Sequence, residues 1–94
     1  MNTEVQESTL WIKDKVTMST LTKRDYDHFY ACLQAKEIHT INLSRITEAD
    51  SACIALLVEA TRLTNHRASK LKMIHIPEGL IMLMKLYGIE EWIQ

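Results

Sequence analysis

The chain has 94 residues, of which 47% are hydrophobic and 24% are charged, and this profile predicts one folded globular domain over residues 1–94, in contrast to a disordered chain. Its 11 basic and 12 acidic residues give a net charge of -1, which argues against the strongly basic surface of a nucleic-acid binder. The sequence contains no apolar run approaching the roughly 18–20 residues needed to cross a bilayer.

Residues 1–8 are polar and acidic, unlike a secretory signal, and we expect them to form a flexible leader. The two cysteines, Cys32 and Cys53, lack the CxxC spacing of metal and redox motifs. Without an export signal, both thiols are expected to be reduced and mostly buried. These features together predict a cytoplasmic protein.

The first predicted elements are a hairpin and a helix. Residues 9–12 and 15–18 are short β-prone runs, and the polar pair at 13–14 between them predicts a tight turn. Thr22, with an acidic residue three positions later, indicates the start of a helix that runs to about Lys36. The apolar face expected for this helix consists of Tyr26, Phe29, Tyr30 and Leu33.

The middle of the chain predicts a strand, a loop and a second helix. The strand is expected over residues 38–43 and the loop over residues 44–49. The helix then begins at Asp50 or Ser51. Its inner side is expected to carry Ile54, Leu57, Val58 and Leu63. Its outer side is expected to carry Glu59, Arg62, Asn65 and His66.

The last predicted elements are a strand over residues 71–76 and a helix that Pro77 opens and Gly88 closes in a left-handed cap. The apolar stripe of this helix consists of Leu80, Ile81, Leu83, Met84 and Tyr87. A hairpin followed by α-β-α-β-α predicts an α/β fold. We expect a mixed sheet of about four strands, the later ones parallel, packed with one layer of about three helices.

The sequence offers little for catalysis or metal binding. Its two glycines, Gly79 and Gly88, belong to the last predicted helix and form no phosphate-binding loop. No ligand-like spacing relates the four histidines, His28, His39, His66 and His75. A Cys/His nucleophile pair stays open, although the apolar surroundings expected for both cysteines work against a nucleophilic thiol. We therefore expect no enzymatic activity, no cofactor and no bound metal.

One segment, residues 48–57, combines features that bear on function. Small side chains crowd the start of its helix, and they allow another backbone to approach closely; they are Ala52, Cys53 and Ala55. The free N–H groups of a helix start can also meet an anion or a carbonyl. Two interpretations stay open: Asp50 and Ser51 simply cap a helix that packs on the sheet, or this helix start is a docking surface.

Ser51 is also a candidate phosphorylation site. A phosphate there would gain from the helix dipole, but Glu48 and Asp50 would repel it and no cluster of arginines lies nearby in the sequence. A modified Ser51 is therefore expected to disrupt a docked interface.

Residues 41–57, INLSRITEADSACIALL, resemble the signature of the STAS domain family. Members of this family typically show a strand ending in DLS, a short loop, DS or DT, small residues and LxLL. The resemblance extends over roughly residues 9–90 and implies a STAS-like fold. The chain departs from the pattern with Asn42 for Asp, Cys53 for Gly, and residues 19–22 for a GELD-like turn.

Within the family, the signature and the KLYG sequence of residues 85–88 are most similar to the small STAS subunits of Mla-type ABC transporters, which move phospholipid between the membranes of Gram-negative bacteria. This implies a non-catalytic subunit that docks on the ATPase subunit at the cytoplasmic face of the inner membrane and supports its assembly or activity. It implies no membrane insertion, nucleic acid or small-molecule substrate. The partner contacts implied by the resemblance are Asp50, Ser51, Ala52, Cys53 and Leu56. The alternative is an anti-sigma-factor antagonist regulated by phosphorylation of Ser51.

Overall fold

The computed structural model describes residues 1–35, 37–64 and 71–89. Lys36, Asn65 and His66, expected at the ends of helices, lie outside these ranges. The elements are, in chain order, β1 (Asn2–Gln6), β2 (Thr9–Val16), α1 (Lys23–Ala35), β3 (Thr40–Ala49), α2 (Ser51–Thr64), β4 (Lys72–Ile74) and α3 (Glu78–Leu86).

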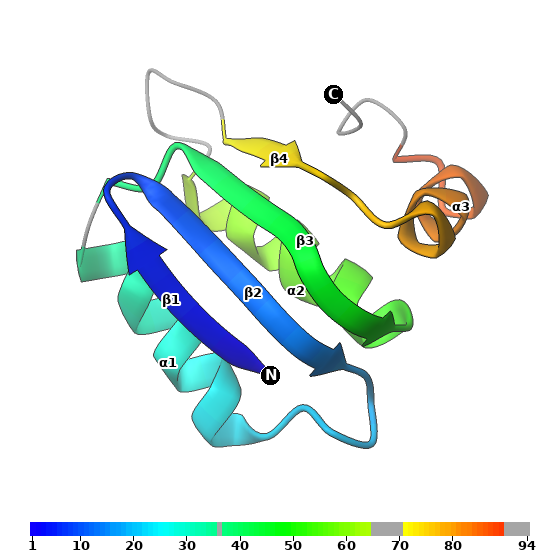
Figure 1. The fold of residues 1–94 in the computed structure, drawn as a ribbon, viewed down its shortest axis with the longest axis horizontal. Coiled ribbons are helices and arrows are strands. Elements are labelled where there is room, and N and C mark those ends of the chain that lie inside the picture. The colour runs from blue at the N-terminus through cyan, green and yellow to red at the C-terminus, as the bar shows by residue number, and fades with distance from the viewer. Residues whose placement is uncertain (36, 65–70, 90–94) are drawn as a thin grey trace.

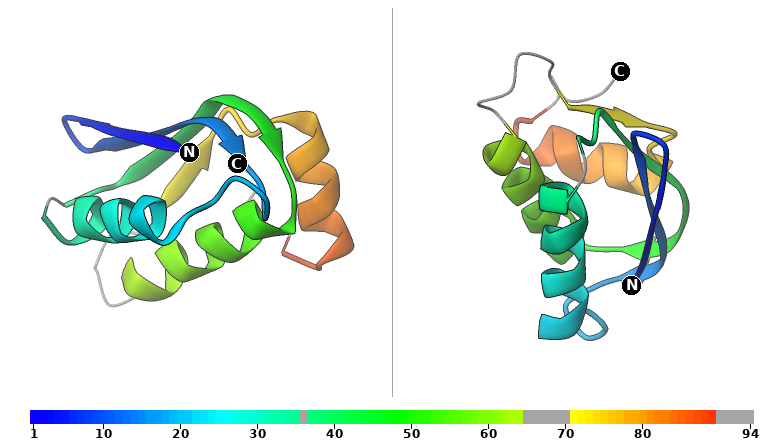
Figure 2. Two further views of the ribbon diagram at one scale, coloured as in Figure 1. Left: turned by 90° about the horizontal axis from the view of Figure 1, so that it is seen from below. Right: turned by 90° about the vertical axis from the view of Figure 1, so that its left-hand side faces the viewer.

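The strands form one mixed sheet in the order β1-β2-β3-β4 (Figure 1). β1 and β2 are antiparallel, whereas β2 with β3 and β3 with β4 are parallel. α1 and α2 lie together on one face of this sheet, and α3 lies beyond the end of β4 and packs against α2 (Figure 2). The expected mixed sheet of four strands with three helices is confirmed.

The hairpin at the start of the chain is shifted from its expected position. Residues 1–8 are not a flexible leader, because β1 pairs along its length with β2, from Asn2 opposite Lys13 to Gln6 opposite Thr9. The turn lies at Glu7 and Ser8. The residue pair at 13–14, expected to be the turn, instead lies within β2 at an irregularity of the sheet, where Asp14 adopts a positive φ of 70°. Asp tolerates this left-handed conformation better than most residues, so the same local signal marks a bulge.

β3 is longer than its sequence predicts. In its first half, Ile41 and Leu43 are fully buried, and Asn42 between them is buried as well. The segment 44–49, expected to be a loop, continues the strand because it pairs with residues 13–16 of β2. Its polar side chains are mostly exposed, while Ile46 packs against the core. Pairing with β2 provides hydrogen-bond partners for the backbone N–H and C=O groups of residues 44–49. This half of β3 therefore needs few apolar residues.

α1 begins with the expected cap. The backbone N–H of Asp25 donates to Thr22 Oγ1, and the N–H of Thr22 donates to Asp25 Oδ2, each at 3.1 Å. This reciprocal pair satisfies two N–H groups at the helix start. Burial alone would raise the pKa of the Asp25 carboxyl, but the bonds from Thr22 and the nearby N-terminal ammonium outweigh it and lower that pKa.

α3 ends as its sequence predicts and begins one residue later. Glu78 is the first helical residue, and Pro77 precedes it as the cap, with its carbonyl accepting from Leu80 and Ile81. At the other end, Gly88 has a φ of 73°, and its N–H donates to the carbonyl of Lys85. This left-handed C-terminal cap suits glycine, which has no Cβ to clash.

The core lies between the sheet and the helices. Three residues expected on apolar helix faces are instead exposed to about half of their surface: Tyr30, Val58 and Tyr87. The buried apolar residues are Leu10, Ile12, Val16, Phe29, Leu33, Ile38, Ile41, Leu43, Cys53, Ile54, Leu56, Leu57, Ala60, Met73, Leu80 and Met84. Among the described residues, no helix is long and apolar enough to span a bilayer.

Candidate protein-docking site

Asp50 connects the start of α2 to the loop that follows β2. Its Oδ1 accepts the backbone N–H of Ala52 at 2.8 Å, which caps the helix. Its Oδ2 accepts the backbone N–H of Met18 at 3.1 Å. One carboxylate therefore fixes the position of this loop relative to the first turn of α2.

The loop itself is held by hydroxyl groups. The Thr20 hydroxyl accepts the backbone N–H of Thr17 at 3.1 Å and lies 2.8 Å from the Thr17 hydroxyl. The backbone N–H groups of Thr20 and Leu21 both donate to the carbonyl of Thr17. This turn leaves the side chain of Met18 75% exposed and brings Leu21 back toward α2.

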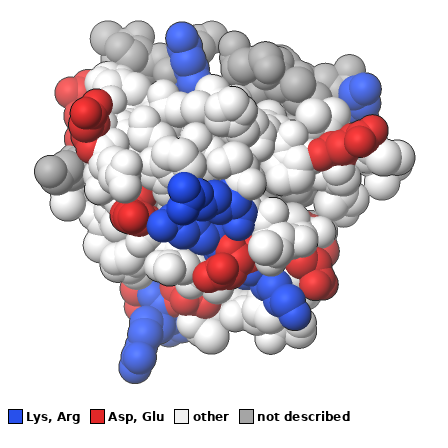
Figure 3. Space-filling model, viewed as in Figure 1, with Lys and Arg blue, Asp and Glu red and all other residues white. Residues whose placement is uncertain are grey.

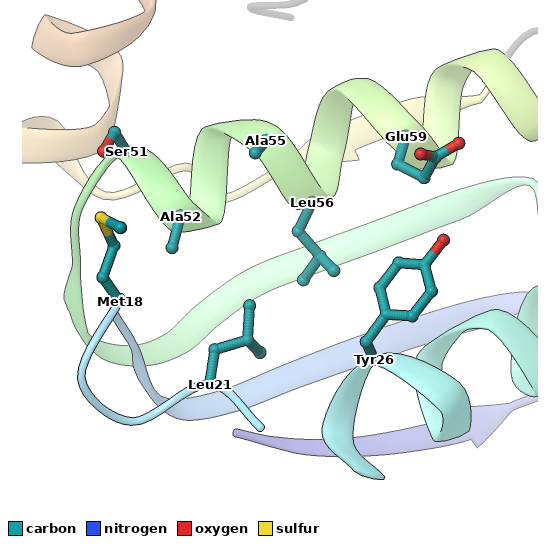
Figure 4. Close-up of a pocket in the computed structure, with 8 residues that line it drawn as sticks. All are labelled: Met18, Leu21, Tyr26, Ser51, Ala52, Ala55, Leu56 and Glu59. Atoms are coloured by element: carbon teal, nitrogen blue, oxygen red, sulfur yellow. The ribbon is translucent and has the colours of Figure 1, made fainter. Parts of the chain in front are cut away.

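A hollow of about 440 Å³ lies between this loop, α1 and α2. Figure 4 shows Leu21 and Leu56 pointing toward each other across it, with Met18 and Ser51 at one end. Ala52 and Ala55 form part of its α2 wall, and because their side chains are small, an incoming group can approach the helix backbone closely. The lining residues are Met18, Leu21, Tyr26, Ser51, Ala52, Ala55, Leu56 and Glu59.

The five residues expected to contact a partner occupy different environments. Ser51 is the first residue of α2 and is exposed, and its hydroxyl has no hydrogen bond within the described part of the chain. Ala52 lines the hollow, and Leu56 lies there with most of its side chain buried. Asp50 is half-buried and structural, as the capping interpretation requires.

Cys53 does not belong to this surface. Its side chain is fully buried in the core, so a partner could not reach it without rearrangement of the domain. Burial, together with the nearby Asp50 carboxylate, raises the pKa of its thiol to about 12. This burial argues against the expected contact of the Cys53 side chain with a partner, and the raised pKa agrees with the expectation that Cys53 is a poor nucleophile.

The hollow also includes residues that sequence reasoning missed. Glu59 was expected only on the outer side of the helix, but it lies three residues after Leu56, so the periodicity of α2 could have identified it. Met18, Leu21 and Tyr26 come from segments before β3. Their approach to α2 depends on tertiary structure and has no local signal.

Positive and negative side chains are mixed on the face of the sheet that is turned away from α1 and α2. In Figure 3, lysines and arginines on this face are interspersed with acidic residues, and large areas between them are uncharged. One exposed cation lies over an aromatic ring, because the Arg45 guanidinium is 5.2 Å from the centre of the Trp11 ring. This face therefore lacks the single-sign surface that binds nucleic-acid phosphates.

Comparisons with known proteins place the fold. No protein-family model matches the chain, and no curated protein sequence matches it. The structure is similar to that of the anti-sigma factor antagonist SpoIIAA in its unphosphorylated form, with a TM-score of 0.68. The two chains are 12% identical, and the match covers 97% of this chain and 83% of SpoIIAA. The four-stranded mixed sheet and three helices therefore form the STAS fold.

Proposed function

We propose that the chain is a non-catalytic docking module that binds a partner protein through the start of α2 and the loop before α1. This docking surface consists of Met18, Leu21, Ser51, Ala52, Ala55 and Leu56. The observation that carries the proposal is the pair of hydrogen bonds that the Asp50 carboxylate accepts from Met18 and Ala52. They hold the loop and the helix together, with Ser51 exposed beside an apolar hollow. A preformed apolar hollow with a polar rim is suited to a protein partner.

The partner we propose is the ATPase subunit of an Mla-type ABC transporter. The chain would then support assembly or activity of the transporter in phospholipid transport between membranes, as an MlaB-like subunit at the cytoplasmic face of the inner membrane. The support for this partner is the resemblance of residues 41–57 and 85–88 to MlaB-type sequences. The docking surface contains the Ser51 position that this resemblance implies for the interface.

A second candidate function is that of an anti-sigma-factor antagonist. The similarity to SpoIIAA favours it, and so does an exposed Ser51 that a partner kinase could reach. A phosphate at this first residue of α2 would meet the positive end of the helix dipole but also the Asp50 carboxylate. Phosphorylation would then add charge and bulk to the docking surface and release the partner.

The two partners can be separated with purified components. The full chain is mixed with the ATPase subunit of an Mla-type transporter, or with a soluble anti-sigma-factor kinase and ATP. The transporter proposal expects a stable complex and a change in ATPase rate, with Ser51 unmodified. The second candidate expects an increase in mass by one phosphate, located at Ser51 by peptide mass spectrometry and lost in Ser51→Ala. Binding to neither partner would contradict both.

A further inference from the structure

A second group of reactive side chains lies where α1 packs on β1, apart from the residues that line the docking surface. His28 and Cys32 are four residues apart on α1, so they lie on the same face of the helix. The Cys32 sulfur is 3.8 Å from His28 Nε2. On the other side of the ring, His28 Nδ1 is 2.6 Å from the Thr3 hydroxyl of β1.

This arrangement is the one found around activated nucleophiles. It consists of a thiol, a base within hydrogen-bond reach of the thiol, and a third group that orients the base. When the imidazole carries its proton on Nδ1, that N–H donates to Thr3 Oγ1 and the lone pair of Nε2 faces Cys32. Thr3 is only 7% exposed and belongs to a paired strand, so it is a fixed support for the ring. His28 and part of Cys32 are open to solvent, so a small reagent can reach the sulfur.

We propose that Cys32 is a reactive thiol, activated by His28, and that it is the site at which this chain forms mixed disulfides with low-molecular-weight disulfides such as oxidised glutathione. The proposal is independent of the docking function, because neither Cys32 nor His28 lines the docking surface. It takes up the Cys/His nucleophile pair that the sequence left open, and it assigns the nucleophile to Cys32.

The reaction is a thiol–disulfide exchange. The Cys32 proton moves to His28 Nε2, and the thiolate sulfur attacks one sulfur of the small disulfide. A new S–S bond forms to Cys32 as the original one breaks, and the departing thiolate takes the proton from the imidazolium. The Cys32 sulfur is oxidised and one sulfur of the reagent is reduced to a thiol, so no further oxidant is needed.

Cys53 provides a control within the same chain. It is fully buried, so a reagent cannot reach its sulfur, and burial raises the pKa of its thiol, so the thiol does not readily ionise. A reagent that modifies folded protein should therefore distinguish the two cysteines.

The experiment uses the full reduced chain, iodoacetamide as the alkylating probe, and peptide mass spectrometry to measure each cysteine at pH 7. Folded Cys32 is expected to react about threefold faster than the same residue in urea-unfolded chain, since the unfolded thiol lacks its base. His28→Gln is expected to slow the folded reaction by about fivefold, and Thr3→Val by about twofold, because Thr3 acts through the ring. Oxidised glutathione is expected to add one glutathione at Cys32, removable by dithiothreitol, with Cys53 unmodified.

His39→Gln is the matched control, since it removes another partly exposed imidazole, and it should leave the Cys32 rate unchanged. Circular dichroism checks that each variant is folded. The proposal is overturned if folded Cys32 reacts no faster than the unfolded residue, or if folded His28→Gln reacts at the wild-type rate. Should His28→Gln fail to fold, the folded and unfolded wild-type rates and Thr3→Val still decide.

Discussion

Met18 and Asp50 are 32 residues apart in sequence and are joined by a hydrogen bond from the Met18 backbone N–H to Asp50 Oδ2. The same carboxylate caps α2 through the N–H of Ala52. Asp50 therefore has two roles: it stabilises the helix, and it determines where the loop at 17–22 lies beside it. The shape of the docking surface depends on both.

The first prediction tests these roles with Asp50→Ala, which removes both hydrogen bonds. Loss of an N-cap typically costs about 1 kcal/mol, within a range of about 0.5–2, and we expect the free energy of unfolding to fall by that amount. Partner binding should fall further, because the loop is no longer held. Urea unfolding and a binding titration measure the two effects.

Asp50→Asn is the intermediate variant, since the two N–H groups donate to different carboxylate oxygens and the amide replaces one of these oxygens with an NH2 group that cannot accept. The control is Glu48→Ala, an exposed carboxylate whose ion pair with Lys15 is at 4.0 Å, and it should change stability by less than about 0.5 kcal/mol. Equal stability and equal binding for Asp50→Ala and wild type would mean that Asp50 does not organise the site.

The second prediction concerns the side of α2 that faces the sheet. Leu57 is fully buried, so Leu57→Ala leaves a cavity and should lower the free energy of unfolding by roughly 2–5 kcal/mol. The neighbouring Val58 is 43% exposed, and Val58→Ala should cost under about 1 kcal/mol. Chemical denaturation of both variants checks the orientation of the helix. Similar losses of unfolding free energy for the two variants would contradict this orientation.

The third prediction follows from the lowered pKa of Asp25. A carboxyl whose folded pKa lies below its unfolded value stabilises the fold at pH values above the unfolded pKa, about 3.9. That contribution disappears as the pH falls through the folded pKa. Asp25→Asn should therefore be less stable than wild type at pH 7, and its stability should decline less between about pH 5 and pH 2. Thermal unfolding over this range measures the difference.

Thr22→Ala provides a companion test, since it removes the hydroxyl that accepts the Asp25 N–H. It should lower stability at pH 7 by about 1 kcal/mol, the usual effect of losing a cap. Parallel acid-unfolding profiles for wild type and Asp25→Asn would show that this carboxyl does not contribute to the pH dependence.

The three helices and the last two strands followed from hydrophobic patterns, but the hairpin and several strand boundaries did not: the strands expected at 9–12 and 15–18 are largely one strand, β2, and β1 lies in the expected leader. Residues 2–6 and 44–49 are polar, and in both cases pairing with β2 makes them strands. Strand pairing across the chain is not encoded in local polarity, because one face of this sheet is solvated and needs no apolar side chains. The turn predicted at residues 13–14 was wrong for a related reason. A residue such as Asp14 that tolerates a positive φ is found in turns and in bulges alike.

The start of α2 could be predicted because a single helix contains the information. The positions of Asp50, Ser51 and Ala52 at the start of α2 followed from capping preferences and small side chains. Cys53 was expected both to be mostly buried and to contact a partner, because a small residue in the first turn suits a tight core and an open interface alike. Met18 and Leu21 could not be found, since the turn that positions them depends on Asp50, far along the chain.

The fourth prediction tests the proposed docking surface with Ser51→Arg. Ser51 is exposed at the first position of α2, beside Met18 and Ala52, so a large side chain there should leave folding intact. It would fill the space that small residues keep free and place a positive charge near the positive end of the helix dipole. We expect binding of the ATPase subunit to weaken by about 2 kcal/mol or more, the effect of a central interface residue. Co-purification, a titration and the transporter ATPase rate measure it.

Two further variants distinguish the effect of the added side-chain volume at Ser51 from the loss of its hydroxyl and from the added surface charge. Ser51→Ala removes the hydroxyl without adding volume, and it should weaken binding by about 1 kcal/mol. Ser44→Arg introduces the same side chain at an exposed serine of β3 outside the docking surface, and it should bind as wild type does. If Ser51→Arg folds normally and still assembles a fully active transporter, the partner binds elsewhere, and the start of α2 serves the fold alone.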